Sequence, residues 1–470
     1  MNIKKYDAYY IFDMDDKSYL FDIFNMECVT IDQSLSQALK DKRIDGLDDH
    51  TALMLQQLES AQLFFYNISD IKFVLPEKYE HIYFSLAPIT KCNLQCAYCF
   101  ADAGQNFISD EREFTPERIQ DVADFLLTTF PECDRFRLDF VSGGEPLLNP
   151  DRLFTILDVT SERFAHHNKS ITYWLCTNAT LLTEEILKQL DRYNVQIGIS
   201  IDGDQDINDK CRMYKNGGGT YQDIVRAIHL VQNSKKISSY IKYIWGLSVI
   251  TTHTNGLVST LKHHKKLGFK NIQMKFVRLN KNNPLAITHD QLPVVFHWID
   301  DLLQYFYDCL NSDDINTPLM FLNENDHLGK ILQRLIIKKP FIFRCHAGRD
   351  KFSFAPNGDI YPCDSFVGIE KYRMGNIYSG ISGDIPDLFT SLSVIRRQIC
   401  KDCWARFVCG GDCFHNSYCA NSNIEIPDDT FCRIMKYMIK KSLVTLNLLY
   451  KNNRNALNRI KHILEIRSKA

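Results

Sequence analysis

The stretch Cys92-Asn-Leu-Gln-Cys96-Ala-Tyr-Cys99 decides the fold of this 470-residue chain. Its cysteines have a CxxxCxxC spacing and directly follow a strand-like run. Three thiolates on one tight loop can hold three irons of a cubane iron–sulfur cluster and leave the fourth iron without a protein ligand. Zinc is the alternative, but a structural zinc site normally takes four protein ligands, and no fourth one follows nearby. The loop therefore predicts an iron–sulfur site with one iron open to a small molecule.

Around this loop, strand-like runs alternate with amphipathic helices. The runs are residues 81–87, 136–142, 171–177, 195–201, 245–251 and 271–278. Alternating strands and helices imply an α/β fold with a parallel sheet and right-handed crossovers. Six such units make a partial (β/α)6 barrel of the TIM type, whose chemistry lies at the carboxyl ends of the strands. The cysteine loop follows the first of these ends.

Two further polar motifs follow strands of this barrel. The second strand ends in Gly143-Gly144-Glu145-Pro146, where paired glycines let the backbone approach a ligand and Glu145 can pair with an ammonium group. The fourth ends in Ser200-Ile-Asp202-Gly203, where Ser200 and Asp202 can hydrogen-bond to ribose hydroxyls. Each motif alone would be an ordinary turn. On one rim with the cysteines, they predict a site for a zwitterionic nucleoside.

This combination resembles the radical S-adenosylmethionine (SAM) superfamily, whose motif matches Cys92, Cys96 and Cys99 with an aromatic residue at Tyr98. The resemblance implies a 4Fe–4S cluster whose open iron binds the amine and carboxylate of SAM. It also implies which residues contact SAM: Gly143, Gly144, Glu145 and Pro146 at the amine, and Ser200 or Asp202 at the ribose. Arg212 is a candidate for the carboxylate, with a surface arginine as the alternative.

Seven of the sixteen cysteines gather near the C-terminus. They are Cys345, Cys363, Cys400, Cys403, Cys409, Cys413 and Cys432, and four residues lie between Gly358 and Cys363. In a reducing compartment, dense groups of cysteines indicate metal ligands rather than disulfides. Seven thiolates cannot complete two four-ligand sites, so one site should lack a protein thiolate. A pair of zinc knuckles is the alternative. The other six cysteines are expected to be small buried hydrophobes.

The spacing of these seven cysteines resembles the SPASM domain of radical SAM enzymes that modify peptides and proteins. The resemblance implies a distal auxiliary cluster on Cys400, Cys403, Cys409 and Cys432, and a proximal one on Cys345, Cys363 and Cys413. The vacant place on the proximal cluster is either an open iron or is filled by His346 or Cys419. Because clusters cross-link such a region, it is expected to need no hydrophobic core of its own.

Asp364 directly follows Cys363. In the anaerobic sulfatase-maturing enzymes that the chain resembles, an aspartate here is thought to take a proton from the substrate, which makes Asp364 a candidate catalytic base. The alternative is a hydrogen bond near the cluster without a chemical role.

Besides the barrel and the SPASM domain, the sequence predicts three more parts. Residues 1–80 combine a candidate hairpin (6–12 and 18–31), helices at 33–40 and 48–62, and a third strand at 71–75. This pattern suggests a winged-helix-like peptide-recognition module, with a simple extension of the barrel as the alternative. The barrel is assigned to residues 81–300, a helical connector to 301–344, and the SPASM domain to 345–432. Residues 433–470 predict a basic helix.

Composition limits what the protein binds. The formal net charge of −2 favours neither nucleic acid nor anionic membranes, and no apolar run reaches the length of a membrane span. The N-terminus lacks the apolar core of a signal peptide, so a cytoplasmic location is expected.

Together these features predict an enzyme with three 4Fe–4S clusters and SAM. The closest likeness is to thioether-forming maturases of ribosomally made peptides, which implies a precursor peptide with a leader and a reductant such as flavodoxin or ferredoxin. Alternatives are carbon–carbon crosslinking of a peptide, or formylglycine formation in a sulfatase. A non-catalytic iron–sulfur electron-transfer protein is the alternative of another class.

Overall fold

A ten-stranded sheet organises the chain. The computed structural model describes residues 7–44, 46–61, 63–73, 78–101, 113–141 and 143–468. The sheet has the order β13-β12-β11-β10-β4-β5-β6-β7-β8-β9. Its barrel half consists of β4 (His81–Ser85), β5 (Arg135–Phe140), β6 (Ser170–Thr177), β7 (Gln196–Ser200), β8 (Trp245–Ile250) and β9 (Asn271–Phe276). These six strands are parallel neighbours in chain order, so the predicted α/β barrel fold is confirmed.

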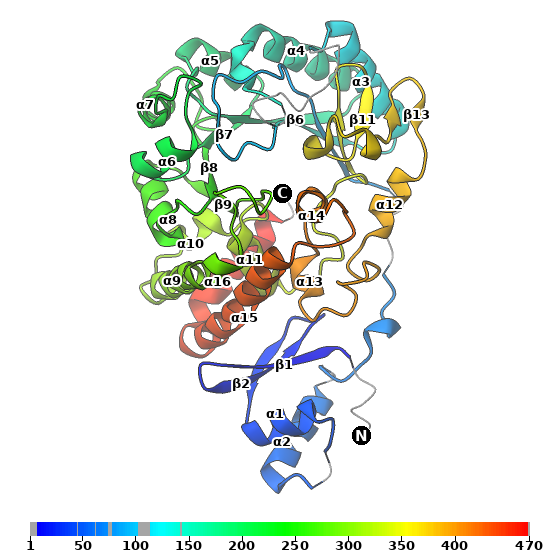
Figure 1. Ribbon diagram of the computed structural model, residues 1–470, viewed down its shortest axis with the longest axis vertical. Coiled ribbons are helices and arrows are strands. Elements are labelled where there is room, and N and C mark those ends of the chain that lie inside the picture. Colours follow the sequence, from blue (N-terminus) through cyan, green and yellow to red (C-terminus); the bar gives the residue numbers. More distant parts are fainter. Residues whose placement is uncertain are drawn as a thin grey trace.

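Amphipathic helices connect the barrel strands and cover their outer face (Figure 1). They are α3 (Pro116–Thr129), α4 (Pro150–His166), α5 (Glu184–Arg192), α6 (Gln205–Cys211), α7 (Tyr221–Asn233) and α8 (Leu257–Lys266). Side-chain caps set several starts: Thr115, Asn149 and Thr183 each accept a hydrogen bond from the third backbone N–H of the helix that follows. Because the helices cover the outer face of the sheet, its inner face is accessible to the loops that follow the strands.

The cysteine-rich region extends this sheet rather than forming a separate body. Its strands are β10 (Lys351–Phe354), β11 (Asp359–Tyr361), β12 (Gly375–Asn376) and β13 (Gly380–Ile381). Strand β10 lies parallel to β4, with Ser353 opposite Ser85. The short helices α12 (Ile385–Ser391), α13 (Arg406–Cys409) and α14 (Phe414–Asn421) complete the region.

This region does have a small hydrophobic core, contrary to expectation. Phe366, Tyr372, Phe389 and Phe414 are all buried and pack edge-to-face on one another. Aromatic rings bury large areas with few residues, which suits a region with little regular structure.

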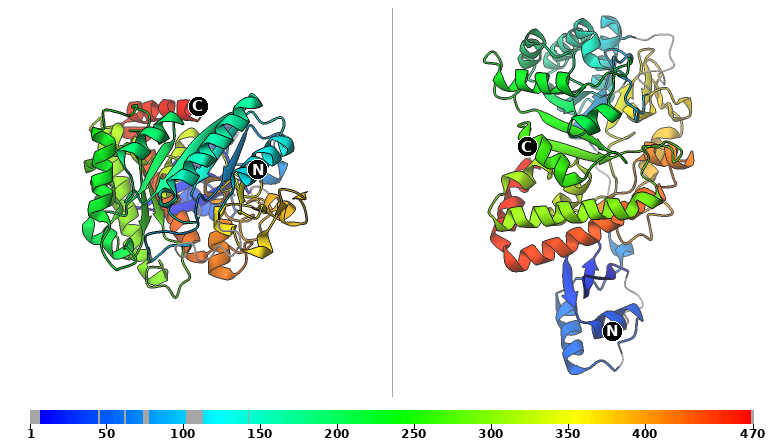
Figure 2. Two further views of the ribbon diagram at one scale, coloured as in Figure 1. Left: turned by 90° about the horizontal axis from the view of Figure 1, so that it is seen from above. Right: turned by 60° about the vertical axis from the view of Figure 1, so that its left-hand side comes forward.

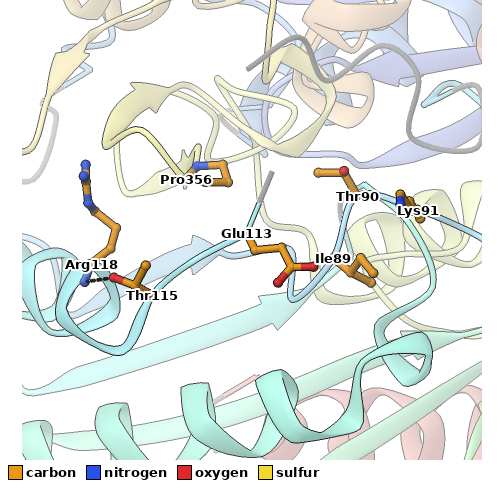
Figure 3. Close-up of a pocket in the computed structure, with 7 residues that line it drawn as sticks. All are labelled: Ile89, Thr90, Lys91, Glu113, Thr115, Arg118 and Pro356. Carbon is orange, nitrogen blue, oxygen red and sulfur yellow. Dashed lines mark hydrogen bonds between the residues drawn. The ribbon is translucent and has the colours of Figure 1, made fainter. Parts of the chain in front are cut away.

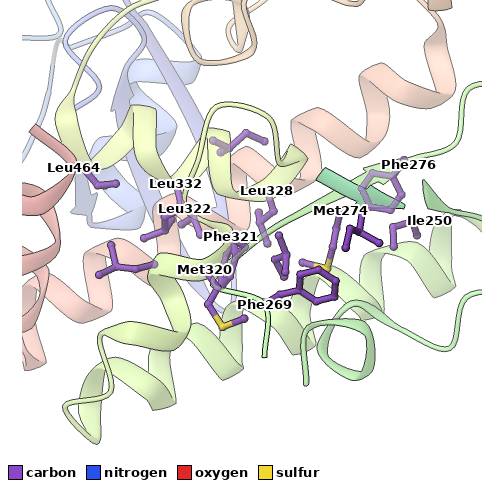
Figure 4. Close-up of a cluster of buried hydrophobic side chains, with 14 of the residues drawn as sticks. Ile250, Phe269, Met274, Phe276, Met320, Phe321, Leu322, Leu328, Leu332 and Leu464 are labelled. Carbon is purple, nitrogen blue, oxygen red and sulfur yellow. The ribbon is translucent and has the colours of Figure 1, made fainter. Parts of the chain in front are cut away.

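Helices from the C-terminal half cover the remaining side of the barrel. They are α9 (Leu292–Asn311), α10 (Asn316–Phe321), α11 (His327–Ile337), α15 (Asp429–Asn452) and α16 (Arg454–Arg467). Figure 4 shows apolar side chains of these helices in one cluster with β9, with Phe321 and Leu328 near Met274 and with Leu464 at the other side of the cluster. Helix α9 spans the predicted boundary between residues 300 and 301, and residues 433–470 form parts of two helices instead of one. Both helices bury an apolar face, because their basic residues occupy only the outer one.

The N-terminal module lies at the far end of the molecule, below α15 in Figure 1. It is a three-stranded antiparallel sheet, β1 (Tyr9–Met14), β2 (Lys17–Asp22) and β3 (Cys28–Ile31), with α1 (Gln33–Lys40) and α2 (Asp49–Ser60). The hairpin and both helices agree with the prediction, and Asp15 and Asp16 adopt the positive φ of its turn. The stretch 18–31 is two strands, not one. The third strand predicted at 71–75 is wrong for residues 71–73, and the other two lie outside the described residues.

Aromatic stacking attaches this module to the rest of the protein. The rings of Tyr10 and Trp404 stack 4.2 Å apart, and the Lys440 ammonium lies 5.7 Å from the Trp404 ring. Asn447 of α15 donates a hydrogen bond to the backbone carbonyl of Cys28 (3.1 Å). Figure 2 shows α15 beside α9, between the barrel and the module. The module therefore docks on α15 and on the segment that carries Cys400, Cys403 and Cys409.

Candidate functional site

The cysteine loop lies over the carboxyl end of the barrel, where the sequence predicted it. Backbone N–H groups of Gln95 and Ala97 donate to the carbonyls of Met213 (2.8 Å) and Cys211 (2.9 Å), which follow the fourth barrel strand. The loop is therefore held by the segment that also carries Arg212. Cys92, Cys96 and Cys99 all line one cavity of about 570 Å³, a size typical of small-molecule sites.

The two glycines of the second motif serve the loop as well as a ligand. A Cβ on Gly144 would lie 1.8 Å from the backbone oxygen of Lys91, and Glu145 N–H donates to that same oxygen (2.9 Å). Only glycine permits this approach, so it sets the position of the residue just before Cys92. Gly143 and Gly144 also line the cavity, while Pro146 begins the short 3₁₀ turn Pro146–Leu148.

Glu145 is a buried carboxylate at the cavity wall. It accepts hydrogen bonds from Thr177 Oγ1 (2.6 Å), Asn178 N (2.7 Å) and Leu147 N (3.1 Å). Burial raises the pKa of Glu145, and these three donors counter that effect. The donors orient the carboxylate in the cavity, where it can meet an ammonium group.

Tyr98, Asp202 and Arg212 form one buried chain of hydrogen bonds. Arg212 Nη1 donates to Tyr98 Oη (2.6 Å), and Tyr98 Oη donates to Asp202 Oδ2 (2.5 Å). Asp202 Oδ1 also accepts from Val249 N (3.0 Å). Of the described residues that line the cavity, Ser200 is one and Asp202 is not. The geometry thus places Ser200 at the cavity, while Asp202 holds Tyr98 through a hydrogen bond and, through Tyr98, Arg212.

Arg212 is a buried arginine, not a surface one. It is 8% exposed, lines the cavity, and has an Nε that finds no hydrogen-bond partner among the described residues. A buried guanidinium N–H without an acceptor is costly, so the site calls for an anionic group there. The carboxylate of an amino acid fits this demand.

The C-terminal cysteines line two different cavities. Burial raises the pKa of the Cys363 thiol, and the negative charges of Asp364, Cys413 and Cys345 add to this effect. Cys345 and Cys413 line the same cavity as the cysteine loop. The other set lines a second cavity of about 260 Å³ beside α15: Cys400, Cys403, Cys409 and Cys432.

The donor sets suit clusters better than single ions. Within the part of the chain that the structure describes, no three His, Cys, Asp or Glu side chains converge closely enough to hold one metal ion. A cubane cluster places each cysteine on a different iron, so its ligands stand farther apart than those of zinc. The cysteine sets offer the thiolate ligands that a 4Fe–4S cluster takes.

The two candidates for the vacant place on the proximal set differ in their surroundings. His346 Nδ1 bonds to Asp350 (2.7 Å) and its ring lies 4.9 Å from that of Tyr83. Cys419 lies 3.7 Å from the ring nitrogens of His415, and the nearby Cys413 raises its pKa. Cys419 is thus the candidate beside the proximal set, while His346 is engaged elsewhere.

Asp364 is held in an ion pair. Its Oδ1 lies 3.1 Å from Lys351 Nζ, which also lies 3.9 Å from Asp139. Burial acts to raise the pKa of Asp364, but Lys351 outweighs it and holds the pKa below its usual range. The carboxylate is ionised, and the next residue, Ser365, lines the cavity.

Sequence reasoning missed six basic residues that line this cavity. They are Lys275, Arg278, His327, Lys330, Arg344 and His415. Lys275 and Arg278 lie at the end of the sixth barrel strand, a position that could have indicated them. His327 and Lys330 come from α11, which packs against β9, Arg344 follows α11 in the chain, and His415 belongs to α14.

Another hollow, of about 390 Å³, lies beyond Lys91 on the outer side of the loop (Figure 3). Ile89, Glu113, Arg118 and Pro356 line it together with two threonines, and no cysteine does. It therefore does not belong to the cluster sites.

Comparison with known proteins agrees with this geometry. Residues 86–249 match the radical SAM superfamily. The chain is 24% identical over 373 residues to a cysteine-type anaerobic sulfatase-maturating enzyme of Clostridium novyi, covering 77% of this chain and 95% of the relative.

Solved structures share the fold. The chain is similar to anSMEcpe with bound AdoMet and the Cp18Cys peptide, with a TM-score of 0.64, 20% identity, and coverage of 81% of this chain and 99% of that one. It is also similar to Streptococcus suis SuiB bound to its precursor peptide SuiA, with a TM-score of 0.51, 16% identity, and coverage of 90% and 98%.

This chain carries a radical SAM domain over residues 86–249 and is an enzyme, with a cysteine-rich extension of its sheet. The family implies a 4Fe–4S cluster and SAM as its cofactors. No helix among the described residues is both long and apolar enough to cross a membrane.

Proposed function

We propose that this protein is a maturase of a ribosomally made precursor peptide and links a cysteine sulfur to a carbon as a thioether. One observation carries the proposal: Cys345 and Cys413 line the same cavity as Cys92, Cys96 and Cys99. A substrate cysteine near the proximal set would then lie within the space where SAM binds. The similar sulfatase-maturating enzyme and SuiB, whose names or bound peptides point to protein and peptide substrates, support a peptide substrate.

The barrel residues would bind and orient the cofactors. Cys92, Cys96 and Cys99 would hold the cluster, Glu145 would meet the methionyl amine of SAM, and Ser200 its ribose. Arg212 would bind the carboxylate through its free Nε, since Nη1 is already held by Tyr98. When bound, the cluster and SAM supply a radical that abstracts hydrogen from the substrate.

The C-terminal cysteines would hold two auxiliary clusters. Cys345, Cys363 and Cys413 would hold the proximal one, and Cys400, Cys403, Cys409 and Cys432 the distal one. A soft thiolate is the ligand that iron in such a cluster prefers, so the vacant proximal place suits a substrate cysteine. Cys419 is the competitor for that place, because it lies beside Cys413.

The N-terminal module would bind the leader of the precursor. An extended peptide can add as a strand to an edge of the β1–β2–β3 sheet, since backbone pairing tolerates varied sequence. The charge of residues 1–80, with 15 acidic and 8 basic residues, favours a basic leader. A flavodoxin or ferredoxin would supply electrons; nucleic acid and membranes are not expected partners, and a cytoplasmic location is expected.

Formylglycine formation in a sulfatase is the second candidate. The ion pair of Asp364 with Lys351 favours it, because an ionised carboxylate beside the cavity can take a proton from the substrate. The similar Clostridium novyi protein is named as an anaerobic sulfatase-maturating enzyme, which also supports this candidate function.

The test is the mass of the product. A cysteine-bearing precursor peptide, encoded beside this gene, is incubated anaerobically with the reconstituted enzyme, SAM and reductant. Each thioether should lower the peptide mass by two hydrogens and remove one thiol from alkylation. A peptide that loses hydrogen but still alkylates at every cysteine would exclude the thioether and favour a carbon–carbon link. Conversion of one cysteine to an aldehyde would favour formylglycine.

A further inference from the structure

The cavity that holds the cysteine loop is also lined by an excess of basic side chains. They are Arg212, Lys275, Arg278, Lys330 and Arg344, against two carboxylates, Glu145 and Glu324. Burial lowers the pKa of Lys275 and of Lys330, and an anion bound beside them would counter that effect. Arg212 and Glu145 belong to the SAM site described above. The remaining four basic side chains and Glu324 come from β9, α11 and the segments next to them, and form the surface that we call the basic wall.

The carboxylate in the basic wall is already used. Glu324 Oε2 lies 3.3 Å from Arg334 Nη2 and 3.8 Å from Lys330 Nζ. Lys275 has no hydrogen bond or ion pair among the described residues, although it reaches into the cavity. Arg344 is 8% exposed, and its Nη1 is buried without a hydrogen-bond partner there. The wall thus holds donors that the protein itself does not satisfy.

His327 adds a donor whose direction can be deduced. Its Nδ1 accepts the backbone N–H of Phe276 (3.1 Å), so a neutral imidazole must carry its proton on Nε2. Burial, aided by the surrounding cations, holds the pKa of His327 well below its usual range, so the ring is neutral. Nε2 lies 3.1 Å from Arg278 Nη2, which is also a donor. Two donors cannot bond to each other, so an acceptor within reach of both would stabilise this arrangement.

We propose that Lys275, Arg278, His327 and Lys330 bind a carboxylate of the substrate peptide, either an acidic side chain near the reacting residue or the C-terminal carboxylate. This proposal rests on the proposed peptide substrate and adds its chemical class. A carboxylate has two oxygens and accepts charge-assisted hydrogen bonds from guanidinium, ammonium and imidazole N–H groups together. The carboxylate of SAM is not the occupant, because Arg212 on another element meets it.

The wall would orient the peptide across the cavity. A carboxylate held at the end of β9 leaves the neighbouring peptide residues between the cysteine loop and Cys413, which line the same space. Such a clamp reduces the freedom of the substrate before reaction. The rival explanation is that the basic wall only balances the negative charge of the clusters, in which case peptide charge should not matter.

The experiment measures peptide binding to the full-length, anaerobically reconstituted protein. The probes are fluorescein-labelled twelve-residue peptides with one cysteine. Each peptide carries a single Asp at one of the four positions on either side of that cysteine, and a matched peptide carries Asn at the same position. A further pair without Asp ends in a free carboxylate or an amide. Fluorescence anisotropy gives the dissociation constants. Arg278→Gln and Lys275→Gln are compared with Arg459→Gln, a surface arginine that pairs with Asp313.

At least one acidic peptide should bind about 10-fold or more tightly than its neutral counterpart, since hydrogen bonds to charged groups are of that strength. The position of the Asp, or the free C-terminus, identifies the source of the carboxylate. Both wall variants should reduce the ratio to near one, and Arg459→Gln should retain it. Equal binding of all acidic and neutral counterparts, or a ratio unchanged in Arg278→Gln, would overturn the proposal.

Two further measurements separate this proposal from neighbouring ones. In the unaltered protein, the acidic peptide should protect Arg278 from phenylglyoxal, as mapped by mass spectrometry, so the result does not depend on a variant that fails to fold. SAM binding should be the same in Arg278→Gln as in the parent. If acidic peptides bind but none is modified, the proposed function fails while the carboxylate site stands. If peptides are modified and bound equally well with or without the carboxylate, the carboxylate site fails while the proposed function stands.

Discussion

Two cavities hold cysteines in this protein, and they differ in what else they contain. The larger, of about 570 Å³, brings the barrel loop together with Cys345 and Cys413, and its walls carry arginines, lysines, histidines and Glu145. The smaller, of about 260 Å³, contains the four cysteines of the distal set, and both apolar residues such as Ile399 and charged ones such as Asp412 line it. Buried donors without a partner, on Arg212 and Arg344, occur among the described residues that line the larger cavity and not among those that line the smaller one.

The smaller cavity instead joins parts of the structure. Cys400, Cys403 and Cys409 lie on a segment with little regular structure, and Cys432 lies in the first turn of α15. A cluster on these four would tie that segment to the longest helix of the protein. The same segment carries Trp404, on which the N-terminal module docks. We therefore propose that the larger cavity is where the chemistry takes place and that the smaller one supports electron transfer and domain assembly.

The largest expected effect is on the larger cavity. Replacing Cys92, Cys96 and Cys99 together with Ala should abolish SAM cleavage and lower the iron content from about twelve to about eight per chain. 5′-Deoxyadenosine formation and an iron assay after anaerobic reconstitution measure both. SAM cleavage by the triple variant at the parent rate would refute the assignment of this loop.

The next prediction replaces one cysteine of each auxiliary set, so that the roles of the two sets can be compared. Cys413→Ala should lower crosslinked product about 100-fold or more while SAM cleavage continues, because losing a ligand costs at least as much as losing an outer-shell partner. Cys432→Ala should lower the melting temperature and keep product within about 10-fold when dithionite supplies electrons. Mass spectrometry of the peptide and thermal unfolding give the two readouts. Loss of product in Cys432→Ala at an unchanged melting temperature would break the comparison.

A pair of arginines provides a sharper test. Arg212→Ala should weaken SAM binding about 10- to 100-fold, since its Nε and the Tyr98–Asp202 chain are lost together. Arg406 is a neighbour of the smaller cavity, donates to Cys403 O (3.1 Å), and serves as the matched control. Its Ala variant should leave SAM affinity within about twofold. Equilibrium dialysis with SAM measures both, and equal weakening by the two variants would contradict the assignment.

The smallest effect concerns the docking of the N-terminal module. Trp404→Ala removes the stack on Tyr10, which is worth about 1 kcal/mol beyond its buried area, so the module should open about fivefold more often. Limited proteolysis between the module and the barrel measures this, with Tyr450→Ala, an exposed tyrosine, as control.

Deleting residues 1–75 extends the same test. The truncated protein should bind precursor more weakly and still cleave SAM without peptide. If it modified full-length precursor as efficiently as the intact chain, the module would have no part in recognition.

Much of the fold was predictable because its signals are local. All six barrel strands lie within one to two residues of their predicted limits, since each is a buried apolar run between turn residues. The third strand of the module was missed because the run 18–31 was interpreted as one strand. The turn within it depends on Asp22, whose side chain accepts from the backbone N–H groups of Phe24 and Asn25.

In the candidate site, too, some residues were predictable from local sequence and others were not. The cysteine loop and the GGEP motif were apparent from spacing alone. Asp202 was expected at the ribose, but it bonds to Tyr98, a residue 104 positions earlier in the chain. Nothing in the local sequence indicates that pairing, because it arises only when the loop packs over the fourth strand.

By itself, the sequence determined the barrel, its cysteine loop and the grouping of the C-terminal cysteines, because periodicity and ligand spacing are properties of short segments. Only the tertiary structure decided that Cys413 faces the same cavity as Cys92, that Arg212 is buried with a free Nε, and that a basic wall lines that cavity. These arrangements join residues far apart in the chain. They depend on how β10 pairs with β4 and how α11 packs against β9, which no local pattern records.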